Sequence, residues 1–512
     1  MDKRKDSSLA ADDAAQLAAL GYTSEFKREM SMWANFSLGF LYLSPVVGVY
    51  TIFGYALATG GPPSIYALLI AGVGQLLVAC VFGEVVAQFP VAGGVYPWAR
   101  RLWGRKWAWM TGWVYMWALM ITIASVAYGA GPYIAWLLGF TASSGSTVTA
   151  ALILIALATV INFMGTKVLA KVAIFGLACE LTGCIAVGLW LLIANRHQSI
   201  TVIFHHYAAG SSGGYFAAFA ASCLLGLWVY YGFEACGDVA EEVPNPGRTI
   251  PKAMRRTVYI GGIASTFICL SFIMATPNIS DVISGKNVDP VRGILISAFT
   301  SAGAKVVLCI VLISFLSCCM SLQAAASRLL YSYGRDRMIF ASKFLSHFWE
   351  ARHIPPYALI VAAALPAAVC VGSLASANAL TKIISFAANG IYIAFAMVVL
   401  AALRARMKGW QPSGLFTLKG WAYPINVCAL AYQIVAMVDM SWPRTPNVSW
   451  VDNWIVLLSA GVVLGIGLVF MALAKPYAGS DAPYSDATTI HQQVAARRAA
   501  ATAAATGADG LS

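Results

Sequence analysis

The apolar segments of this sequence constrain its fold more than any other feature. Of its 512 residues, 60% are hydrophobic and 11% are charged, and the mean hydropathy is +0.73, which excludes an ordinary soluble domain. A window of about nineteen residues finds twelve apolar segments long enough to cross a bilayer. We therefore predict an all-α integral membrane protein with spans near residues 32–59, 64–89, 107–137, 147–164, 171–194, 215–240, 256–275, 304–331, 357–374, 378–402, 421–440 and 453–474.

The distribution of positive charge predicts the orientation of these spans. An even number of spans puts both chain ends on one side, and loops rich in Lys and Arg face the cytoplasm. Most of the 33 Lys and Arg residues fall in the tails and in the loops on the side of the N-terminus. We expect both termini in the cytoplasm, with the protein in the cytoplasmic (plasma) membrane. The same loops explain the net charge of +12, so no nucleic-acid partner is expected. Six Lys and Arg residues fall instead in the loops on the opposite, outer side of the membrane: Arg196, Lys286, Arg292, Lys305, Lys382 and Arg444.

The domain organisation follows from the spans. We expect a cytoplasmic tail (1–31), a core of ten helices (32–402), two further helices (403–474) and a cytoplasmic tail without regular structure (475–512). The eleven Cys residues lie in or beside apolar segments without the spacing of metal ligands, and the six His residues lie in loops or tails. We therefore expect no metal site and no cofactor.

Two of the predicted spans carry interruptions. The segment that starts at Tyr215 meets Gly232 and Glu234 before it has crossed the bilayer, and the first span carries Ser44-Pro45 and Gly48 near its midpoint. Lipid cannot satisfy free backbone groups, so a broken helix survives only where it lines a protein-enclosed cavity. Interruptions five helices apart indicate two five-helix repeats of inverted topology. A proline kink with tight glycine packing is the alternative for either span alone.

Four motifs resemble the amino acid, polyamine and organocation (APC) superfamily of transporters. They are SPVVGVYT, GEVVAQFPVAGGVYPWARRLWG, GFEACGDVAEEVPNPGRTIPKAM and SRLLYSYGRDRMIF, and together they cover most of residues 32–402. The chain looks most like the amino acid/choline branch. The resemblance implies a 5+5 inverted-repeat core of the LeuT type with broken helices 1 and 6, followed by two C-terminal helices. It also implies secondary active transport, which is not an enzymatic activity.

The resemblance implies that the broken first helix binds both the carboxylate and the ammonium group of a substrate. The backbone amides of Val47, Gly48 and Val49 would bind its carboxylate at the positive N-terminal end of a half-helix. Val46 and Val47 replace two glycines that are frequent in the family, so the substrate can differ from a typical α-amino acid. Carbonyl groups near Ser44 would accept hydrogen bonds from its ammonium group.

The second interruption would complete the site. Carbonyl groups of Tyr231 and Gly232 would also accept from the ammonium group, and Trp228 matches the family position where an aromatic ring covers the substrate. Ordinary packing or anchoring at the membrane interface is the alternative for Trp228.

Two acids are candidates for proton coupling. Glu180 lies inside the fifth span, and the nearest charged residue in the sequence is Lys171. An acid inside the membrane is a functional candidate by default. Many relatives have a Lys there, so a role for Glu180 reverses the usual charge, and a neutral acid bonded between helices is the alternative. Glu234 lies in the second interruption and would organise the cavity or relay protons. Sodium is the alternative coupling ion, held by hydroxyls of Ser314, Ser317 and Ser321.

The resemblance places the loop after the second span at the cytoplasmic mouth. Pro90, Gly93, Gly94 and Tyr96 form a candidate gate or hinge, because the glycines permit a tight turn. The two arginines that follow, Arg100 and Arg101, would face lipid phosphates or acidic helix ends. The acids Asp238, Glu241 and Glu242 are expected to cap helices or to pair with Arg248, Lys252 or Arg255.

These features predict a proton-coupled permease that imports an amino acid or a related amine such as γ-aminobutyrate. The alternatives are a permease for choline, a polyamine or another organocation, and a nutrient sensor that keeps the fold without transporting. The sequence contains neither His-Glu-x-x-His nor Gly-x-Ser-x-Gly, which argues against an embedded hydrolase. The expected partners are a small-molecule substrate and the lipid bilayer, and the oligomeric state stays open.

Overall fold

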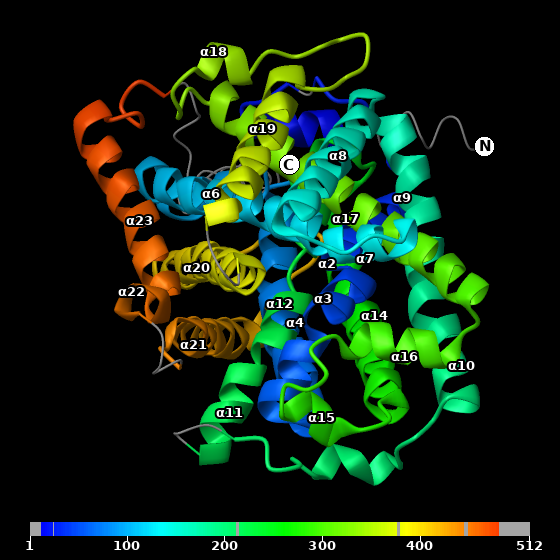
Figure 1. Cartoon of the computed structure of the whole chain (residues 1–512). Coiled ribbons are helices and arrows are strands. Elements are labelled where there is room, and N and C mark those ends of the chain that lie inside the picture. Colours follow the sequence, from blue (N-terminus) through cyan, green and yellow to red (C-terminus); the bar gives the residue numbers. More distant parts are fainter. Residues whose placement is uncertain (1–11, 24, 211–213, 376–378, 445–448, 481–512) are drawn as a thin grey trace, which may run out of the picture.

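The computed structural model describes residues 12–23, 25–210, 214–375, 379–444 and 449–480 (Figure 1). Every regular element in these ranges is a helix, and the one isolated β-bridge there joins Trp349 and Ile354. The all-helical prediction is therefore confirmed for the described part of the chain. Most of the predicted C-terminal tail, from residue 481 onward, lies outside the described residues.

The helices follow the predicted spans closely. The first half contains α2 (Met32–Leu43), α3 (Pro45–Gly60), α4 (Tyr66–Gln88), α5 (Val95–Trp103), α6 (Arg105–Gly129), α7 (Gly131–Leu138), α8 (Ser144–Phe163), α9 (Thr166–Leu181), the π-helical turn η2 (Thr182–Ala186) and α10 (Val187–Ala194). The second half contains α11 (Gly214–Ser222), α12 (Leu224–Val229), α13 (Ala235–Asp238), η4 (Ala240–Glu242), α14 (Pro246–Ala275), α15 (Ile279–Ile283), α16 (Pro290–Ala298), α17 (Ser301–Arg335), α18 (Ser342–Leu345), α19 (Pro356–Gly372), α20 (Ala379–Met407), α21 (Ala422–Ser441), α22 (Trp450–Asn453) and α23 (Ile455–Ala474).

In the described residues, ten helical segments are long and apolar enough to cross a membrane. Shorter apolar helices, Gly214–Val229 and Pro356–Gly372, lie where the sixth and ninth spans were predicted. The helix before the second interruption is too short to cross a membrane, because it ends at Val229. Its shortness agrees with a helix that stops inside the protein.

The broken first span lies at the centre of the bundle. The segment Met32–Gly60 is almost wholly buried, whereas α23 exposes most of its surface. Figure 1 shows α22 and α23 at the edge of the bundle beside α20 and α21. Around the first span, α2 packs against α9, α14 and α17, and α14 also packs along α4. The interruption in the first span is therefore enclosed by protein, as an unsatisfied backbone in a membrane requires.

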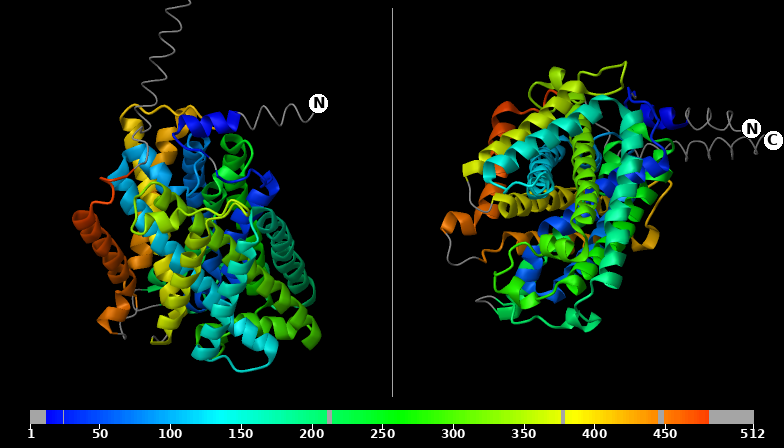
Figure 2. Two further views of the ribbon diagram at one scale, coloured as in Figure 1. Left: turned by 90° about the horizontal axis from the view of Figure 1, so that it is seen from above. Right: turned by 45° about the vertical axis from the view of Figure 1, so that its right-hand side comes forward.

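Residues 12–23 and 25–31, which we call the N-terminal segment, pack across one end of the bundle. In the left view of Figure 2, this segment (dark blue) and the α7–α8 connection (cyan) lie at opposite ends. Leu17 and Phe26 are buried, and the Arg28 side chain donates to the carbonyl oxygen of Val243 at 2.7 Å. The amide of Met30 donates to the carbonyl oxygen of Glu242 at 3.0 Å. Sequence patterns assigned no structure to this segment, although it binds the loop that follows the second interruption.

Buried ion pairs hold the same end together, with partners that differ from those predicted. Arg328 donates to Glu242 at 2.8 and 3.2 Å, and Arg335 donates to Glu241 at 3.0 and 3.2 Å. The expectation that these acids pair with Arg248, Lys252 or Arg255 is wrong for both. The end of α17 lies beside η4 in space, a neighbour that sequence proximity does not reveal. Glu84 likewise pairs with Arg406 of α20.

We predict that Arg328→Leu destabilises the protein strongly, by about 3–5 kcal/mol, because it leaves Glu242 as a buried charge without its cation. The two side chains are 2% and 1% exposed. Thermal unfolding in detergent, followed by size-exclusion chromatography, measures the effect. The matched control is Lys286→Leu, whose pair with Asp281 is exposed and whose loss changes stability little. Equal melting midpoints for both variants would contradict the prediction.

Candidate functional site

The first helix breaks at Ser44. Its backbone adopts φ 44° and ψ 88°, so α2 ends at Leu43 and α3 begins at Pro45. The amide of Ser44 still donates to the carbonyl oxygen of Phe40 at 2.7 Å, which closes the last turn of α2. Pro45 has no amide hydrogen and suits the first position of a new helix. A serine cap followed by proline therefore converts one membrane span into two half-helices.

The second break lies directly against the first. Gly232 has φ +115°, between the end of α12 at Val229 and the start of α13. A Cβ atom on Gly232 would lie 2.5 Å from the backbone nitrogen of Leu43, and one on Gly48 would lie 2.7 Å from a methyl carbon of Val229. Both glycines are therefore required for close approach. The structure brings together the two interruptions that the sequence predicted.

Every amide at the start of α3 has a partner within the chain. Val46 donates to Oε2 of Glu180 at 3.1 Å, and the Ser44 hydroxyl donates to Oε1 of the same carboxyl group. Val47 donates to the Ser44 hydroxyl oxygen at 3.1 Å, and Gly48 donates to the Ser44 carbonyl oxygen at 2.8 Å. A carboxyl group thus occupies the positive end of this half-helix, where such groups are stabilised.

The amides at the start of α3 that lack a partner inside the helix lie closer to the N-terminus than the predicted Val47, Gly48 and Val49. Val49 is the fifth residue of α3, and only the first four amides of a helix lack a partner inside it. Val46, which the prediction left out, holds the carboxyl group instead. The chain also unwinds at Ser44 and not at Gly48. The Ser-Pro pair was the signal for this boundary, because serine is a preferred N-cap and proline a preferred first residue.

Glu180 is fully buried between the first break and α17. It lies at the end of α9, just before the π-helical turn η2, a type of distortion that is frequent at functional sites. Ser314 of α17 lies beside the same carboxyl group. Among the salt bridges of the described residues, none includes Glu180. Glu180 lies within the apolar helical segment Thr166–Ala194, and its direct contact with the first break was not foreseen.

Glu234 forms a second buried acidic centre with Asp238. The amide of Gly232 donates to Oε2 of Glu234 at 2.8 Å. The Tyr115 hydroxyl lies 3.3 Å from Oε1 of Glu234 and 3.0 Å from Oδ2 of Asp238, so it bridges the two side chains. Both acids are fully buried. Sequence reasoning placed Asp238 near the cytoplasmic surface and missed this arrangement, because Tyr115 comes from the distant helix α6.

Aromatic side chains border the second break. The ring of Trp228 meets that of Tyr231 edge-on at 5.6 Å, and Tyr231 meets Tyr42 of α2 edge-on at 6.0 Å. Trp228 is 5% exposed. The two predicted aromatic residues therefore lie together beside the contact between the breaks. That Trp228 covers a substrate stays a prediction.

The predicted gate loop packs on the second acidic centre. Gly93 has φ +86° and its amide donates to the carbonyl oxygen of Asp238 at 2.9 Å. Gly94 has φ +43°, and a Cβ atom there would lie 2.4 Å from Oδ1 of Asp238. Pro90 is buried in the same loop, and Tyr96 donates to Asp336 at 2.7 Å. The loop thus joins α13 to the end of α17, at the end of the bundle that holds the N-terminal segment.

Tyr22 of the N-terminal segment enters this network. Its hydroxyl donates to Asp336 at 2.8 Å and accepts from Arg100 at 2.7 Å. Burial, with a contribution from the Asp336 carboxylate, raises the pKa of the Tyr22 hydroxyl, so it stays protonated. Arg100 was predicted to face either lipid phosphates or an acidic helix end. In the structure it pairs with Asp336, which caps the C-terminal end of α17.

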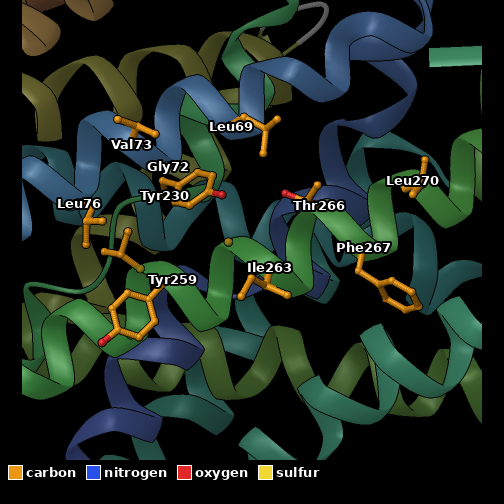
Figure 3. Close-up of a pocket in the computed structure, with 12 residues that line it drawn as sticks. Leu69, Gly72, Val73, Leu76, Tyr230, Tyr259, Ile263, Thr266, Phe267 and Leu270 are labelled. Atoms are coloured by element: carbon orange, nitrogen blue, oxygen red, sulfur yellow. The ribbon is translucent and has the colours of Figure 1, made fainter. Parts of the chain in front are cut away.

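Two cavities in the described residues border the region of the breaks, and neither Gly48 nor Gly232 lines them. A cavity of about 310 Å³ at the end opposite the N-terminal segment is lined by Tyr50, Gly54, Tyr133 and the start of α16. The Tyr133 hydroxyl donates to the carbonyl oxygen of Tyr50 at 2.8 Å. A larger groove of about 440 Å³ lies between α4 and α14, with Tyr230 at its base (Figure 3). Its side chains are apolar and several are exposed on the bundle surface, as expected for a groove that faces lipid.

Two of the three serine hydroxyls proposed for sodium donate to backbone carbonyl groups. Ser321 donates to Leu38 at 2.5 Å, and Ser314 donates to Ile310 at 3.2 Å. The described residues contain no cluster of three or more His, Cys, Asp or Glu side chains able to hold a metal ion.

Comparison with known proteins agrees with this architecture. Residues 34–474 match the family model described as amino acid permease. The amino-acid permease BAT1 homolog of Oryza sativa subsp. japonica is 25% identical over 85% of this chain and 89% of its own length, and amino-acid permease BAT1 of Arabidopsis thaliana is 23% identical over 88% and 92%. An uncharacterized amino-acid permease of Schizosaccharomyces pombe is 26% identical over 90% and 85%. The chain therefore belongs to the amino acid permease family of the APC superfamily, a family of transporters and not of enzymes.

Proposed function

We propose that this chain is a secondary active permease that imports an amino acid or a related amine, such as γ-aminobutyrate, by proton-coupled alternating access. The contact between two helix breaks, each with a buried carboxylic acid beside it, carries the proposal. Broken helices at the centre of a membrane protein present helix ends to polar ligands, and buried acids mark proton paths. The family and its named relatives support amino acid transport in general.

The proposed architecture has twelve spans with a 5+5 inverted repeat of the LeuT type. The short helix Gly214–Val229 and the helix α19 complete the ten longer spans. The broken helices α2–α3 and α11–α13 would then be helices 1 and 6. α4 packs against α12 and α14, and α14 also packs against α2, α3 and α13, so these four spans would form the moving bundle. Rocking of this bundle against the remaining helices would open the site to each side in turn.

The substrate would lie between the two breaks. Its carboxylate would bind the end of α3 near Val47 and Gly48, and its ammonium group would bind carbonyl groups near Ser44, Tyr231 and Gly232. Trp228 would cover the ammonium group.

Glu180 and Glu234 make the proton the preferred coupling ion. Each acid is fully buried, and each accepts a hydrogen bond from an amide next to a break, so a change in its charge changes the backbone at the break. Sodium is the alternative. A permease for choline, a polyamine or another organocation would keep the ammonium half of the site, and a nutrient sensor would bind without transport.

We predict that the purified protein in liposomes accumulates labelled amino acids when the outside is acidic. Protonation outside and release inside would drive net import. A panel of the common L-amino acids and γ-aminobutyrate, with choline and putrescine as competitors, defines the substrate. Accumulation that follows a sodium gradient and ignores the pH gradient would contradict proton coupling. Saturable binding without accumulation would favour the sensor.

A second prediction concerns Trp228. Replacement by Ala should weaken substrate binding by about 2- to 30-fold, which corresponds to a lost cation–π contact of about 0.5–2 kcal/mol. Trp228→Phe should retain most of the affinity. Trp421→Ala is the matched control, because that side chain is 71% exposed on the surface. Unchanged affinity in Trp228→Ala would remove this residue from the site.

The third prediction tests orientation. We propose that the protein lies in the plasma membrane with both termini in the cytoplasm, which places Lys286 outside and Lys408 inside. Both positions are exposed in the structure. In Lys286→Cys, a membrane-impermeant maleimide should label intact cells, whereas Lys408→Cys should react only after lysis. The reverse pattern would contradict the proposed orientation.

A further inference from the structure

The end of α3 is already occupied by a carboxyl group of the chain itself. Glu180 accepts from the Val46 amide at 3.1 Å and from the Ser44 hydroxyl. The next two amides donate to the side chain and the carbonyl group of Ser44. Pro45 has no amide hydrogen to offer. A substrate carboxylate therefore finds no donor at this helix end while Glu180 stays in place.

We propose that Glu180 is a built-in competitor of the substrate carboxylate: its protonation frees the two donors that it holds at the start of α3, the Val46 amide and the Ser44 hydroxyl, so only substrates that carry a carboxylate bind together with a proton. This inference rests on the proposed function and adds to it a substrate class for the coupled reaction. It also gives Glu180 and Glu234 different roles.

Electrostatics supports an exchange of one carboxylate for another. A helix N-terminus carries roughly half of a positive charge, which stabilises one anion close to it. Two carboxylates at the same position in a buried site repel each other, so one of them must be neutral. Protonated Glu180 accepts hydrogen bonds weakly and becomes a donor. The proton binds an oxygen of Glu180, no covalent bond other than that O–H bond forms, and the charge at the helix end stays the same after the exchange.

Among the described residues, no other carboxylic acid is a perturbing neighbour of Glu180. The titratable groups that face it are Tyr50 of α3, Cys179 on its own helix, Cys184 of η2 and Cys318 of α17. Tyr50 and the cysteines are neutral near pH 7 at their ordinary pKa values. Glu234 is held instead by the Gly232 amide and the Tyr115 hydroxyl on the other break. Titration of Glu180 is therefore the event that directly changes the donors at the start of α3.

One side chain, Tyr50, links the cavity at one end of the bundle to the region of Glu180. Tyr50 lines the cavity of about 310 Å³, and its hydroxyl donates at 3.2 Å to the carbonyl oxygen of Gly183, three residues after Glu180. Movement of this side chain would connect the cavity to Glu180. The proton and the substrate would then arrive through the same opening, as an exchange at one helix end requires.

The test compares ligands that differ only in the carboxylate. L-Lysine is paired with cadaverine, and γ-aminobutyrate with n-propylamine, together with any amino acid that the uptake panel identifies. Proton uptake on binding is measured for the wild-type protein with a pH indicator in weak buffer. We expect one proton per bound amino acid and none per bound amine. Equal uptake for both ligands of a pair, or no uptake with a bound amino acid, would overturn the proposal.

Variants provide an independent readout. Between pH 8 and pH 6, amino acid affinity of the wild type should rise by up to about tenfold per pH unit. Glu180→Gln should lose this pH dependence and bind at pH 8 as tightly as the wild type does at acidic pH. Glu350→Gln, at an exposed acid, is the matched control and should keep the pH slope. If the affinity of Glu180→Gln still depends on pH, the inference is overturned, whereas proton-driven uptake by the wild type would still support the proposed function. A wild type that binds none of the amino acids or amines would overturn both.

Discussion

The contact between two interrupted helices determines most of what this molecule can do. Gly232 approaches the backbone of Leu43 so closely that any Cβ atom would collide with it. Inside a membrane, backbone groups freed by such breaks need partners that lipid cannot supply. Here the chain supplies them, since Glu180 binds the start of α3 and Glu234 binds the Gly232 amide. The acids that we propose for coupling therefore also complete the backbone of the breaks.

The end of the bundle near the N-terminal segment is closed by a connected set of contacts. The gate loop binds Asp238, which shares Tyr115 with Glu234. The same loop reaches Asp336 through Tyr96, and Tyr22 binds there as well. A change at Glu234 thus reaches the loop through a hydroxyl and a backbone contact. The opposite end holds the cavity lined by Tyr50.

The sequence predicted the features that depend on local chemistry. Apolar length predicted the helices, Ser44-Pro45 and Gly232 predicted both breaks, and isolation in an apolar segment singled out Glu180. It failed where the answer depends on which distant segments meet. Arg328 and Arg335 replace the predicted partners of Glu242 and Glu241, because the end of α17 folds back onto η4. The carboxyl group on Val46 could not be foreseen either, since nothing in the sequence places α9 beside the first break.

The most direct test of the account is a structure of the protein at pH 6 with a transported amino acid bound. The account predicts density between the two breaks, with the ligand carboxylate within hydrogen-bond distance of the Val46 and Val47 amides, Glu180 withdrawn from them and Trp228 over the ammonium group. It would be contradicted by a ligand bound only elsewhere, for example in the groove between α4 and α14, with Glu180 still bonded to Val46.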